Sequence, residues 1–301
     1  MEIANTSVHP LENQTKTSHR NPASQPIVLT TDFGLADPFV GVMKGVVLGI
    51  NPTATIIDLT HQIRPQNVQQ AAFVLGTSYR FFSAGSIHVV VVDPGVGTSR
   101  QALLLVTPLG RFLAPDNGVL SYILGDHLED PPAQAGKIEV PPDLTAYTLT
   151  NSRYWLHPVS HTFHGRDIFG PVAAHLSLGV PPEEMGARAR QLVWLPAPRP
   201  EVKGASIRGE VINVDRFGNL VTNIPESALP KGGKTEIGIK GRLIKELSLT
   251  YNEGELSTAR GLIALVGSNG YLEIALPSGS AALTLEADVG EPVHVTAKQQ
   301  P

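Results

Sequence analysis

Residues 87–98 read Ile-His-Val-Val-Val-Val-Asp-Pro-Gly-Val-Gly-Thr, and this stretch decides the fold. The segment Ile87–Val92 is nearly continuous in aliphatic residues, which is typical of a strand that is buried on both faces. An aspartate and a glycine-rich turn, Asp93–Thr98, follow it directly. Strands of this kind belong to parallel sheets that helices cover on both sides, so the stretch predicts an α/β domain.

Strand and helix patterns alternate on both sides of this stretch. Further strands are predicted from β-branched and aliphatic runs at Ile27–Asp32, Ala54–Leu59, Ala102–Val106 and Arg111–Ala114, the last two as a hairpin. Helices are predicted from apolar residues at helical spacing at Asp37–Ile50, Gln66–Phe82 and Ile168–Leu178. We therefore expect a three-layer α/β domain with a mostly parallel sheet over residues 26–194.

A second domain is predicted after a proline-rich linker. Leu195–Pro200 contains three prolines in alternate positions, which makes the chain stiff, and the linker is placed at 195–205. No helical pattern is found beyond it. Seven short strand patterns follow, at Ile207–Val214, Leu220–Ile224, Glu236–Lys240, Leu262–Val266, Tyr271–Leu276, Ala282–Glu286 and Val293–Ala297. Residues 206–298 are therefore predicted to form a smaller all-β barrel or sandwich.

Composition excludes several classes of function. The 301 residues carry 23 Lys plus Arg and 27 Asp plus Glu, a net charge of −4, so a nucleic-acid or membrane-surface binder is not expected. Cysteine is absent, which excludes disulfides, thiolate metal sites and a cysteine nucleophile. Residues 1–25 are polar and are predicted to be a disordered tail without a secretory signal, so a cytoplasmic location is expected.

Polar clusters follow four of the predicted strands. They are Thr31–Gly34, Asp58–His61, Asp93–Thr98 and Pro115–Gly118. Any one of them could be an ordinary turn, because Asp, Asn and Gly are the usual turn residues. Ligands of open α/β sheets bind beyond the carboxyl ends of the strands, however, so four clusters at one edge favour a binding site there.

Three more clusters carry groups that could act in a site. Thr162–Asp167 places His, Arg and Asp around a glycine before a predicted helix, although it could simply begin that helix. In the second domain, Asp215–Asn219 ends one strand and Gly267–Tyr271 joins two, and both could be hairpin turns.

A metal site is a weaker alternative. His157, His161 and His164 have the spacing of ligands on one helix face. Pro158 and Gly165 make a continuous helix there unfavourable, so no metal and no cofactor is predicted.

Six of these clusters, in this order, resemble the S-adenosyl-L-methionine (SAM) hydroxide adenosyltransferases, which are relatives of the SAM-dependent fluorinase and chlorinase. The matching clusters are Thr30–Gly34, Asp58–His61, Asp93–Thr98, Pro115–Gly118, Thr162–Asp167 and Asp215–Asn219. The resemblance extends from Ile27 to Ala297.

This resemblance implies a reaction, an assembly and a set of residues. Water or hydroxide would attack the ribose 5′-carbon of SAM and give adenosine and L-methionine. The enzyme would be a homotrimer, with each site between the α/β domain of one subunit and the β domain of its neighbour. The catalytic residues would be Asp93, Arg100 and His164. The SAM-binding residues would be Asp32, Phe33, Asn117, Asp215, Phe217, Asn219 and Ser268, with Asp32 on the ribose, Asp215 on the methionine ammonium, Ser268 near its carboxylate, and Phe217 and Asn219 on the adenine.

Departures from the fluorinase imply the hydroxide branch of this family. Gln66 stands in the place of a tryptophan, Asp93 in that of a tyrosine, and Gly165 in that of the halide-binding serine, while the turn Pro108–Gly110 replaces a longer loop. A carboxylate at position 93 would repel a halide and could accept a proton from water. The alternatives are a SAM-dependent halogenase and a non-catalytic SAM- or adenosine-binding protein. Residues 126–154 match the family loosely and receive no role.

Overall fold

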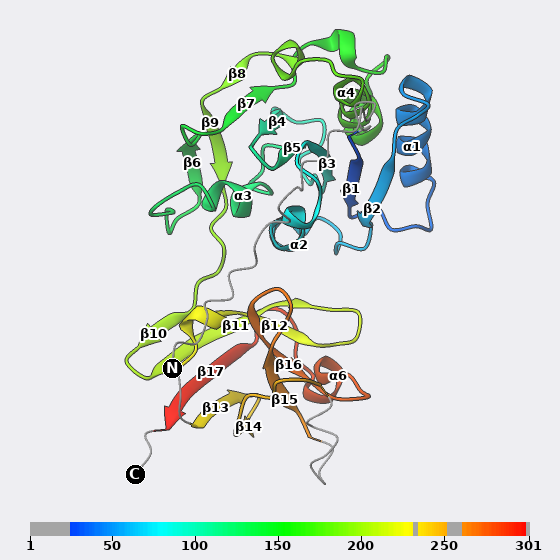
Figure 1. Cartoon of the computed structure of the whole chain (residues 1–301). Coiled ribbons are helices and arrows are strands. Elements are labelled where there is room, and N and C mark those ends of the chain that lie inside the picture. The colour runs from blue at the N-terminus through cyan, green and yellow to red at the C-terminus, as the bar shows by residue number, and fades with distance from the viewer. Residues whose placement is uncertain (1–24, 231–233, 252–260, 299–301) are drawn as a thin grey trace, which may run out of the picture.

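The computed structural model describes residues 25–230, 234–251 and 261–298. Within these ranges the chain forms an α/β domain followed by a β domain, coloured blue to green and yellow to red in Figure 1. The predicted tail, apart from Gln25, lies outside the described residues.

The α/β domain is built on a seven-stranded sheet whose first four strands are parallel. In spatial order its strands are β2 (Ile56–Thr60), β1 (Ile27–Thr31), β3 (Ser86–Val91), β5 (Gly110–Pro115), β4 (Ala102–Val106), β7 (Thr145–Thr148) and β8 (Arg188–Ala189). The β1–β2, β1–β3 and β3–β5 pairs are parallel, and the pairs made by β4, β7 and β8 are antiparallel. The predicted α/β fold and the hairpin of β4 and β5 are confirmed.

Helices cover both faces of this sheet, as Figure 1 shows. Helices α1 (Phe39–Ile50) and α4 (Gly170–Ser177) pack on one face, and α2 (Val68–Ser78) and α3 (Ser121–Gly125) on the other. All of β3 is buried, and its side chains alternate: Val89 joins the core beneath α1 and α4, whereas Val90 joins the core beneath α2 and α3. Burial of each such side chain contributes about 1.5–3 kcal/mol to folding, which explains the uninterrupted aliphatic run.

Helix ends differ from the predicted bounds for local reasons. Helix α2 begins at Val68 because the Asn67 side chain accepts the backbone N–H of Gln70 at 2.9 Å, an N-terminal cap. It continues into the 3-10 turn η1 (Tyr79–Phe81). The helix predicted at 168–178 begins instead as a π-helical turn, η3 (Gly165–Phe169), which leads into α4.

Residues 126–154, for which the sequence suggested no role, include a strand that holds the chain where it leaves the first domain. Strand β6 (Gly136–Glu139) pairs with β9 (Gln191–Trp194) as a separate two-stranded sheet. The Trp194 indole N–H donates to the Pro132 carbonyl at 2.9 Å, and the Leu195 N–H donates to the Ser121 hydroxyl at 2.8 Å. Residues 195–200 then carry no helix or strand. The 3-10 turns η2 (Ser152–Tyr154) and η4 (Pro182–Met185) complete this part of the domain.

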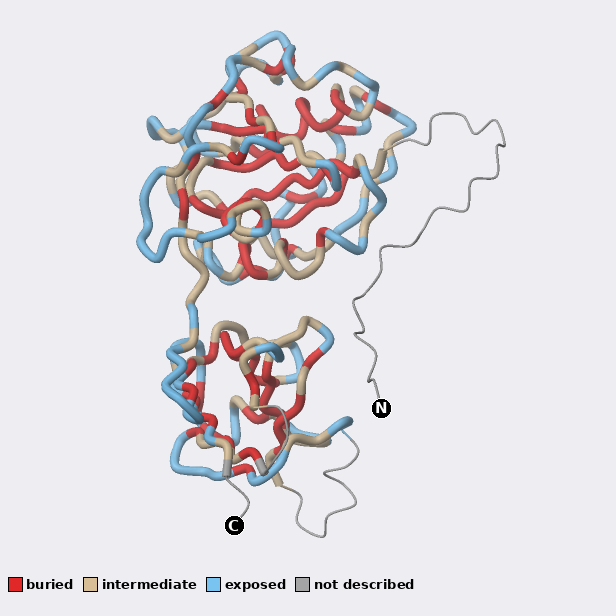
Figure 2. The backbone as a smooth tube through the Cα atoms, turned by 60° about the vertical axis from the view of Figure 1, so that its left-hand side comes forward, coloured by how far each residue is buried: buried red, intermediate tan, exposed pale blue. Residues whose placement is uncertain are grey.

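The β domain is an antiparallel sheet that curls around its own core into a nearly closed barrel. Its spatial order is β14 (Arg242–Ile244), β13 (Lys234–Ile239), β17 (Pro292–Lys298), β11 (Ser206–Val214), β12 (Leu220–Pro225), β16 (Tyr271–Ala275) and β15 (Ile263–Val266), with β10 (Glu201–Lys203) paired to β11. A 3-10 turn, η5 (Glu226–Ala228), follows β12. Figure 2 shows buried residues gathered separately inside each domain. The predicted barrel is confirmed.

One strand prediction in this domain is wrong. Residues 282–286 were expected to form a strand, but Ala281–Leu285 forms helix α6, so the expectation of no helix after the linker also fails. The Ser280 hydroxyl accepts the Leu283 N–H at 3.1 Å and caps the helix, and Glu286 ends it in the left-handed conformation at φ 49°. In so short a segment this cap outweighs the alternation of apolar residues that suggested a strand.

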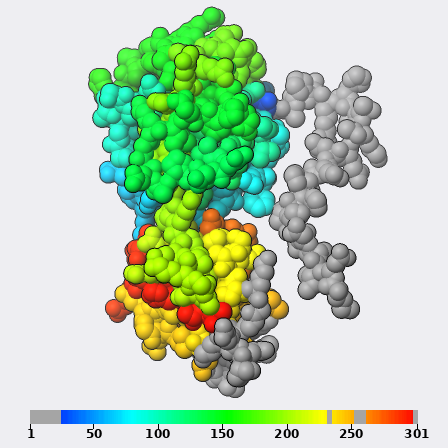
Figure 3. All heavy atoms as spheres, turned by 90° about the vertical axis from the view of Figure 1, so that its left-hand side faces the viewer, coloured from blue at the N-terminus to red at the C-terminus, as the bar shows by residue number. Residues whose placement is uncertain are grey.

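The two domains touch beside the linker, and Figure 3 shows them as two lobes joined at a narrow waist. Arg64 forms an ion pair with Asp288 at 2.7 Å. The Gln70 amide donates to the Asn213 side chain at 2.9 Å, and the rings of Phe73 and Tyr271 meet edge to face at 5.8 Å. Among the described residues, each helix is too short or too polar to cross a membrane.

A buried histidine makes the stability of the fold sensitive to acid. His88 in β3 is 1% exposed and stacks on Phe112, and burial lowers its pKa to about 4. Between pH 6.5 and pH 4 the unfolded chain binds a proton that the folded chain does not. Folding stability attributable to this side chain therefore falls as the pH falls through that window, by up to about 3 kcal/mol.

The variant H88F tests this effect by denaturant unfolding at pH 7 and pH 4. We expect H88F to fold at pH 7, because neither ring nitrogen of His88 has a hydrogen-bond partner in the described residues. It should lose less stability on acidification than the original protein. Equal losses in the two proteins would show that His88 does not titrate in this way.

Candidate functional site

A cavity of about 370 Å³ lies beyond the carboxyl ends of β1 and β3, where ligands of open α/β sheets bind. All of its lining comes from the α/β domain. The lining residues are Asp32, Phe33, Phe39, Pro65, Gln66, Val91, Asp93, Pro94, Val96, Thr162, Phe163, His164 and Gly165. Two of the four strand-end clusters, Thr31–Gly34 and Asp93–Thr98, line this cavity together with the cluster Thr162–Asp167. The other two strand-end clusters, Asp58–His61 and Pro115–Gly118, are not part of its lining.

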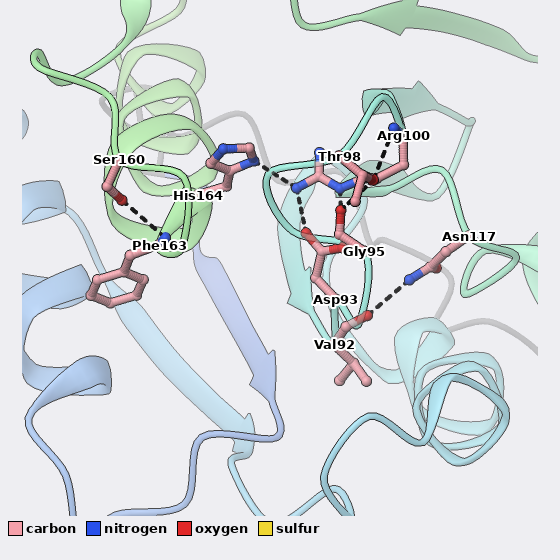
Figure 4. Close-up of polar contacts among 9 residues, drawn as sticks. All are labelled: Val92, Asp93, Gly95, Thr98, Arg100, Asn117, Ser160, Phe163 and His164. Carbon is pink, nitrogen blue, oxygen red and sulfur yellow. Dashed lines mark hydrogen bonds and ion pairs between the residues drawn. The ribbon is translucent and has the colours of Figure 1, made fainter.

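A carboxylate, a guanidinium and an imidazole form a continuous polar chain at its edge, drawn in Figure 4. Arg100 Nε donates to Asp93 Oδ1 at 3.0 Å, and Arg100 Nη2 contacts both Asp93 Oδ2 and His164 Nδ1, the latter at 2.7 Å. The side chains of Asp93 and Arg100 are only 4% and 11% exposed. Asp93 and Arg100 are thus fixed, with little access to water, against His164, which lies 64 residues beyond Arg100 in the sequence.

Arg100 decides the protonation state of His164. A guanidinium can only donate hydrogen bonds, so Nδ1 of His164 accepts, and the imidazole is neutral with its proton on Nε2. Burial lowers the pKa of His164 below 6.5, and the positive charge of Arg100 lowers it further, whereas Asp93 and Asp167 act in the opposite direction. A hydrogen bond between the ring and the Ser160 backbone also acts to raise the pKa, so His164 is held by its own loop as well as by Arg100.

The loops that carry Arg100 and His164 lie in direct backbone contact. Gly97 has φ 76°, and a Cβ there would lie 2.3 Å from the His161 carbonyl oxygen. Only glycine fits both the conformation and the approach. The Thr98 hydroxyl donates to the Gly95 carbonyl at 2.7 Å and closes the turn before Arg100. This close packing brings the two loops near enough for the Arg100–His164 contact.

A buried carboxylate holds the loop before His164 in place. Asp167 lies within η3, and its Oδ2 accepts the Ser160 N–H at 2.8 Å while Arg166 Nε donates to its Oδ1 at 2.6 Å. Burial acts to raise the pKa of Asp167, but these bonds outweigh it and lower the pKa. Gly165 lies against helix α1, where a Cβ would stand 3.0 Å from the Met43 sulfur, so a larger side chain requires a shift.

The turn after β1 forms the opposite side of the cavity. Asp32 accepts the Gln66 N–H on Oδ2 at 2.7 Å. Phe33 contacts the rings of Phe39 and Phe163, with centroids 5.7 and 5.8 Å away. Sequence patterns did not point to Phe39, which simply follows a predicted helix start, and they gave no sign that the Gln66 backbone reaches Asp32.

Other predicted binding residues lie outside the lining of this cavity. Asn117 donates to the Val92 carbonyl at 2.9 Å and so ties the β5 turn to the end of β3 (Figure 4). In the β domain, Asp215 Oδ1 accepts the N–H groups of Phe217 and Asn219, each at 2.9 Å, and Oδ2 accepts the Asn219 side chain. Phe217 is 76% exposed, and Ser268 is exposed in the turn between β15 and β16.

The three histidines considered as metal ligands do not form a cluster. Within the described ranges, no group of three or more His, Asp or Glu side chains is placed to hold a metal ion. His157 bonds through Nε2 to the Ser152 carbonyl at 2.9 Å, and His164 Nδ1 faces Arg100.

Comparison with known proteins shows which family this chain matches. Residues 27–186 match the model of the SAM hydroxide adenosyltransferase N-terminal domain, and residues 209–294 match that of its C-terminal domain. A Thermus thermophilus protein named (R)-S-adenosyl-L-methionine hydrolase is 37% identical over 90% of this chain and 99% of its own length. A protein of the same name from Methanocaldococcus jannaschii is 31% identical over 89% and 95%.

A more distant relative and a solved structure also match nearly the whole chain. A fluorinase from an Actinoplanes species is 26% identical over 90% of this chain and 97% of its own. A crystal structure of an uncharacterized conserved protein from Thermotoga maritima superposes with a TM-score of 0.79 at 34% identity, covering 90% of this chain and 99% of that one.

The state of His164 can be measured directly. We expect NMR of histidine-labelled protein to find its proton on Nε2 at pH 7 and its pKa below 6.5. The variant R100M should raise that pKa, although burial will keep it from returning fully to the ordinary value. A matched control is R153M, because Arg153 lowers the pKa of His175 and not that of His164. A proton on Nδ1, or a pKa unaffected by R100M, would contradict the assignment.

Proposed function

Because this chain belongs to the SAM hydroxide adenosyltransferase family, we propose that it hydrolyses SAM to adenosine and L-methionine. The observation that carries the proposal is the buried Asp93–Arg100–His164 chain at the edge of the cavity. Those side chains are of the types that can activate and orient a water molecule.

The reaction places its demand on the nucleophile. The water oxygen bonds to the ribose 5′-carbon as the carbon–sulfur bond breaks, and the bonding pair moves to sulfur. The sulfonium charge is thereby lost and methionine leaves as a neutral thioether, so no general acid is needed. Water itself has a pKa of about 15.7 and is a poor nucleophile at neutral pH. An acceptor for its proton and groups that orient it are therefore required.

The three catalytic residues divide this work. Asp93 accepts the proton of the attacking water. Of the three linked side chains, it is the carboxylate, and it lines the cavity. Arg100 bonds to both carboxylate oxygens and fixes the plane of the carboxyl group. His164, neutral and carrying its proton on Nε2, donates a hydrogen bond to the water. Fixing the water in line with the sulfur supplies much of the acceleration.

The methionine and adenine parts of SAM require residues that the cavity of one chain lacks. Asp32, which is assigned to the ribose, and Phe33 line it, whereas Asp215, Phe217, Asn219 and Ser268 lie in the β domain. We propose that a neighbouring subunit supplies these four residues in a homotrimer. The exposure of Phe217, 76%, supports this, because a partner would cover an aromatic ring that is costly to leave in water. Asn117 would act indirectly, through the end of β3.

A halogenase is the first alternative, and two features disfavour it. Asp93 places a carboxylate on the wall of the cavity, where its negative charge would repel a halide ion. Gly165 offers no hydroxyl, and Met43 leaves little room for one. The second alternative is a non-catalytic binding protein, and only a measurement of turnover distinguishes it from the hydrolase.

The activity is tested by incubating the purified protein with SAM and resolving the products by chromatography. We expect adenosine and methionine in equal amounts, unchanged by a chelator, and no halogenated nucleoside in saturating chloride or fluoride. Both sulfonium epimers are assayed separately, because the relatives' names specify the (R) form. SAM binding without turnover would support the binding protein, and a 5′-halogenated product would support the halogenase.

Substitutions separate the catalytic from the binding residues. D93N and H164A should lower kcat by about 10²–10⁴-fold with little change in SAM binding, because they remove the proton acceptor or the water donor. D32N should mainly raise KM, by about tenfold or more. D37N removes an exposed carboxylate near Asp32 and serves as the matched control. Original turnover by D93N and H164A would refute the triad assignment.

Mixed subunits test the shared site. D93N and D215A should each be strongly impaired alone, since one lacks the proton acceptor and the other the ammonium partner. If sites form between subunits, refolding the two together should restore activity, because some sites then pair two intact halves. No recovery in mixed trimers, or a monomer by light scattering, would contradict the assembly.

A further inference from the structure

A buried histidine beside residues 31–34, the turn that carries Asp32, has no part in the proposed mechanism. His61 follows β2 and is 4% exposed. Its Nδ1 lies 2.9 Å from the Thr31 hydroxyl, and its Nε2 lies 3.0 Å from Asp58 Oδ1. Lys44 in turn lies 2.6 Å from Asp58 Oδ2. A chain of four polar side chains therefore runs from the surface to the residue before Asp32.

Two side chains meet the His61 ring. The Asp58 carboxylate lies within ion-pair distance of Nε2, and Nδ1 shares a hydrogen bond with the Thr31 hydroxyl. The same hydroxyl oxygen accepts the Phe33 N–H at 3.2 Å. Thr31, which is fully buried, is thus hydrogen-bonded both to the His61 ring and to the backbone two residues later. This bends the chain around Asp32.

Two further contacts join the same segments. The Gly34 N–H donates to the His61 carbonyl at 2.8 Å, and the Gln66 N–H donates to Asp32 Oδ2 at 2.7 Å. Gln66 makes its contact from φ 64°, a conformation uncommon for a residue with a side chain. We call segment 61–66 the clasp. It meets the ribose turn, 31–34, through one side chain and two backbone groups.

We propose that His61 and Thr31 are positioning residues, which act through Asp32 to set the affinity of the site for the ribose hydroxyls. This inference rests on the proposed function, which assigns the ribose to Asp32. With Oδ2 held by the clasp, Asp32 Oδ1 has no hydrogen bond among the described residues and is left for a ribose hydroxyl. Without the Thr31–His61 contact, the turn and its carboxylate lose their fixed orientation.

Matched variants separate this role from simple packing. T31V keeps the shape of the side chain and removes the hydroxyl, whereas T31S keeps the hydroxyl. H61N keeps a polar atom at the position of Nδ1, and H61Q keeps one at the position of Nε2. T31V and H61Q should therefore lose the contact, and T31S and H61N should retain it.

Calorimetry with two nucleosides measures how strongly each variant recognises the ribose hydroxyls. Adenosine carries the ribose hydroxyls and 2′,3′-dideoxyadenosine lacks them, so the ratio of their Kd values reports recognition of those hydroxyls. We expect the original protein to bind adenosine at least about tenfold more tightly, as for a hydrogen bond to a charged group. T31V and H61Q should reduce this ratio to about threefold or less, with T31S and H61N close to the original. With SAM, T31V should raise KM and leave kcat within about threefold.

The variant D32N distinguishes failure of the inference from failure of the proposed function. If D32N leaves the ratio unchanged, Asp32 does not bind the ribose and the assignment beneath the inference is wrong. If D32N abolishes the preference while folded T31V and H61Q keep it, the positioning role is overturned and the proposed function stands. T31V combined with D32N should bind no worse than D32N alone, and an additive loss would also overturn the role.

Discussion

Parallel pairing of β1, β2, β3 and β5 is the constraint on which the rest of the structure depends. Parallel strands end at the same edge of a sheet, so residues that follow them are brought together whatever their distance in the sequence. Asp32, Asp93 and Asn117 all come after such strands. The aliphatic run of β3 fixes this arrangement, because a strand buried on both faces is stable only when helices cover it on each side.

Around that edge, backbone contacts set the positions of the charged groups. Gly97 lets one loop approach the backbone of His161, and the result is that Arg100 reaches Asp93 and His164 together. The guanidinium can only donate, which orients the carboxylate, and its charge adds to the effect of burial in keeping the imidazole neutral. On the other side of the cavity, the Gln66 N–H orients Asp32 in a similar way. The site is thus built from hydrogen bonds whose direction is fixed by the type of group, and a low exposure protects them from water.

The residues that we propose to bind SAM are divided between the two domains. The cavity belongs to the first domain, while Asp215, whose carboxylate is held by its own turn, belongs to the second. Helix α6 packs against that turn, since the Ala282 N–H donates to the Gly218 carbonyl at 2.9 Å. Strand periodicity alone suggested a strand here, because five residues are too few to separate the two patterns and a cap at Ser280 carries little weight in a sequence.

By itself, the sequence determined the architecture and the identity of most groups in the cavity. The run before Asp93, the alternation of strands and helices and the proline-rich linker each have one stable arrangement, set by local burial and chain stiffness. Only the tertiary structure decided which groups touch. The contacts of Gln66 with Asp32, of His61 with Thr31 and of Gly97 with His161 join segments 30 or more residues apart, and they depend on backbone atoms or on exact approach, neither of which residue type records.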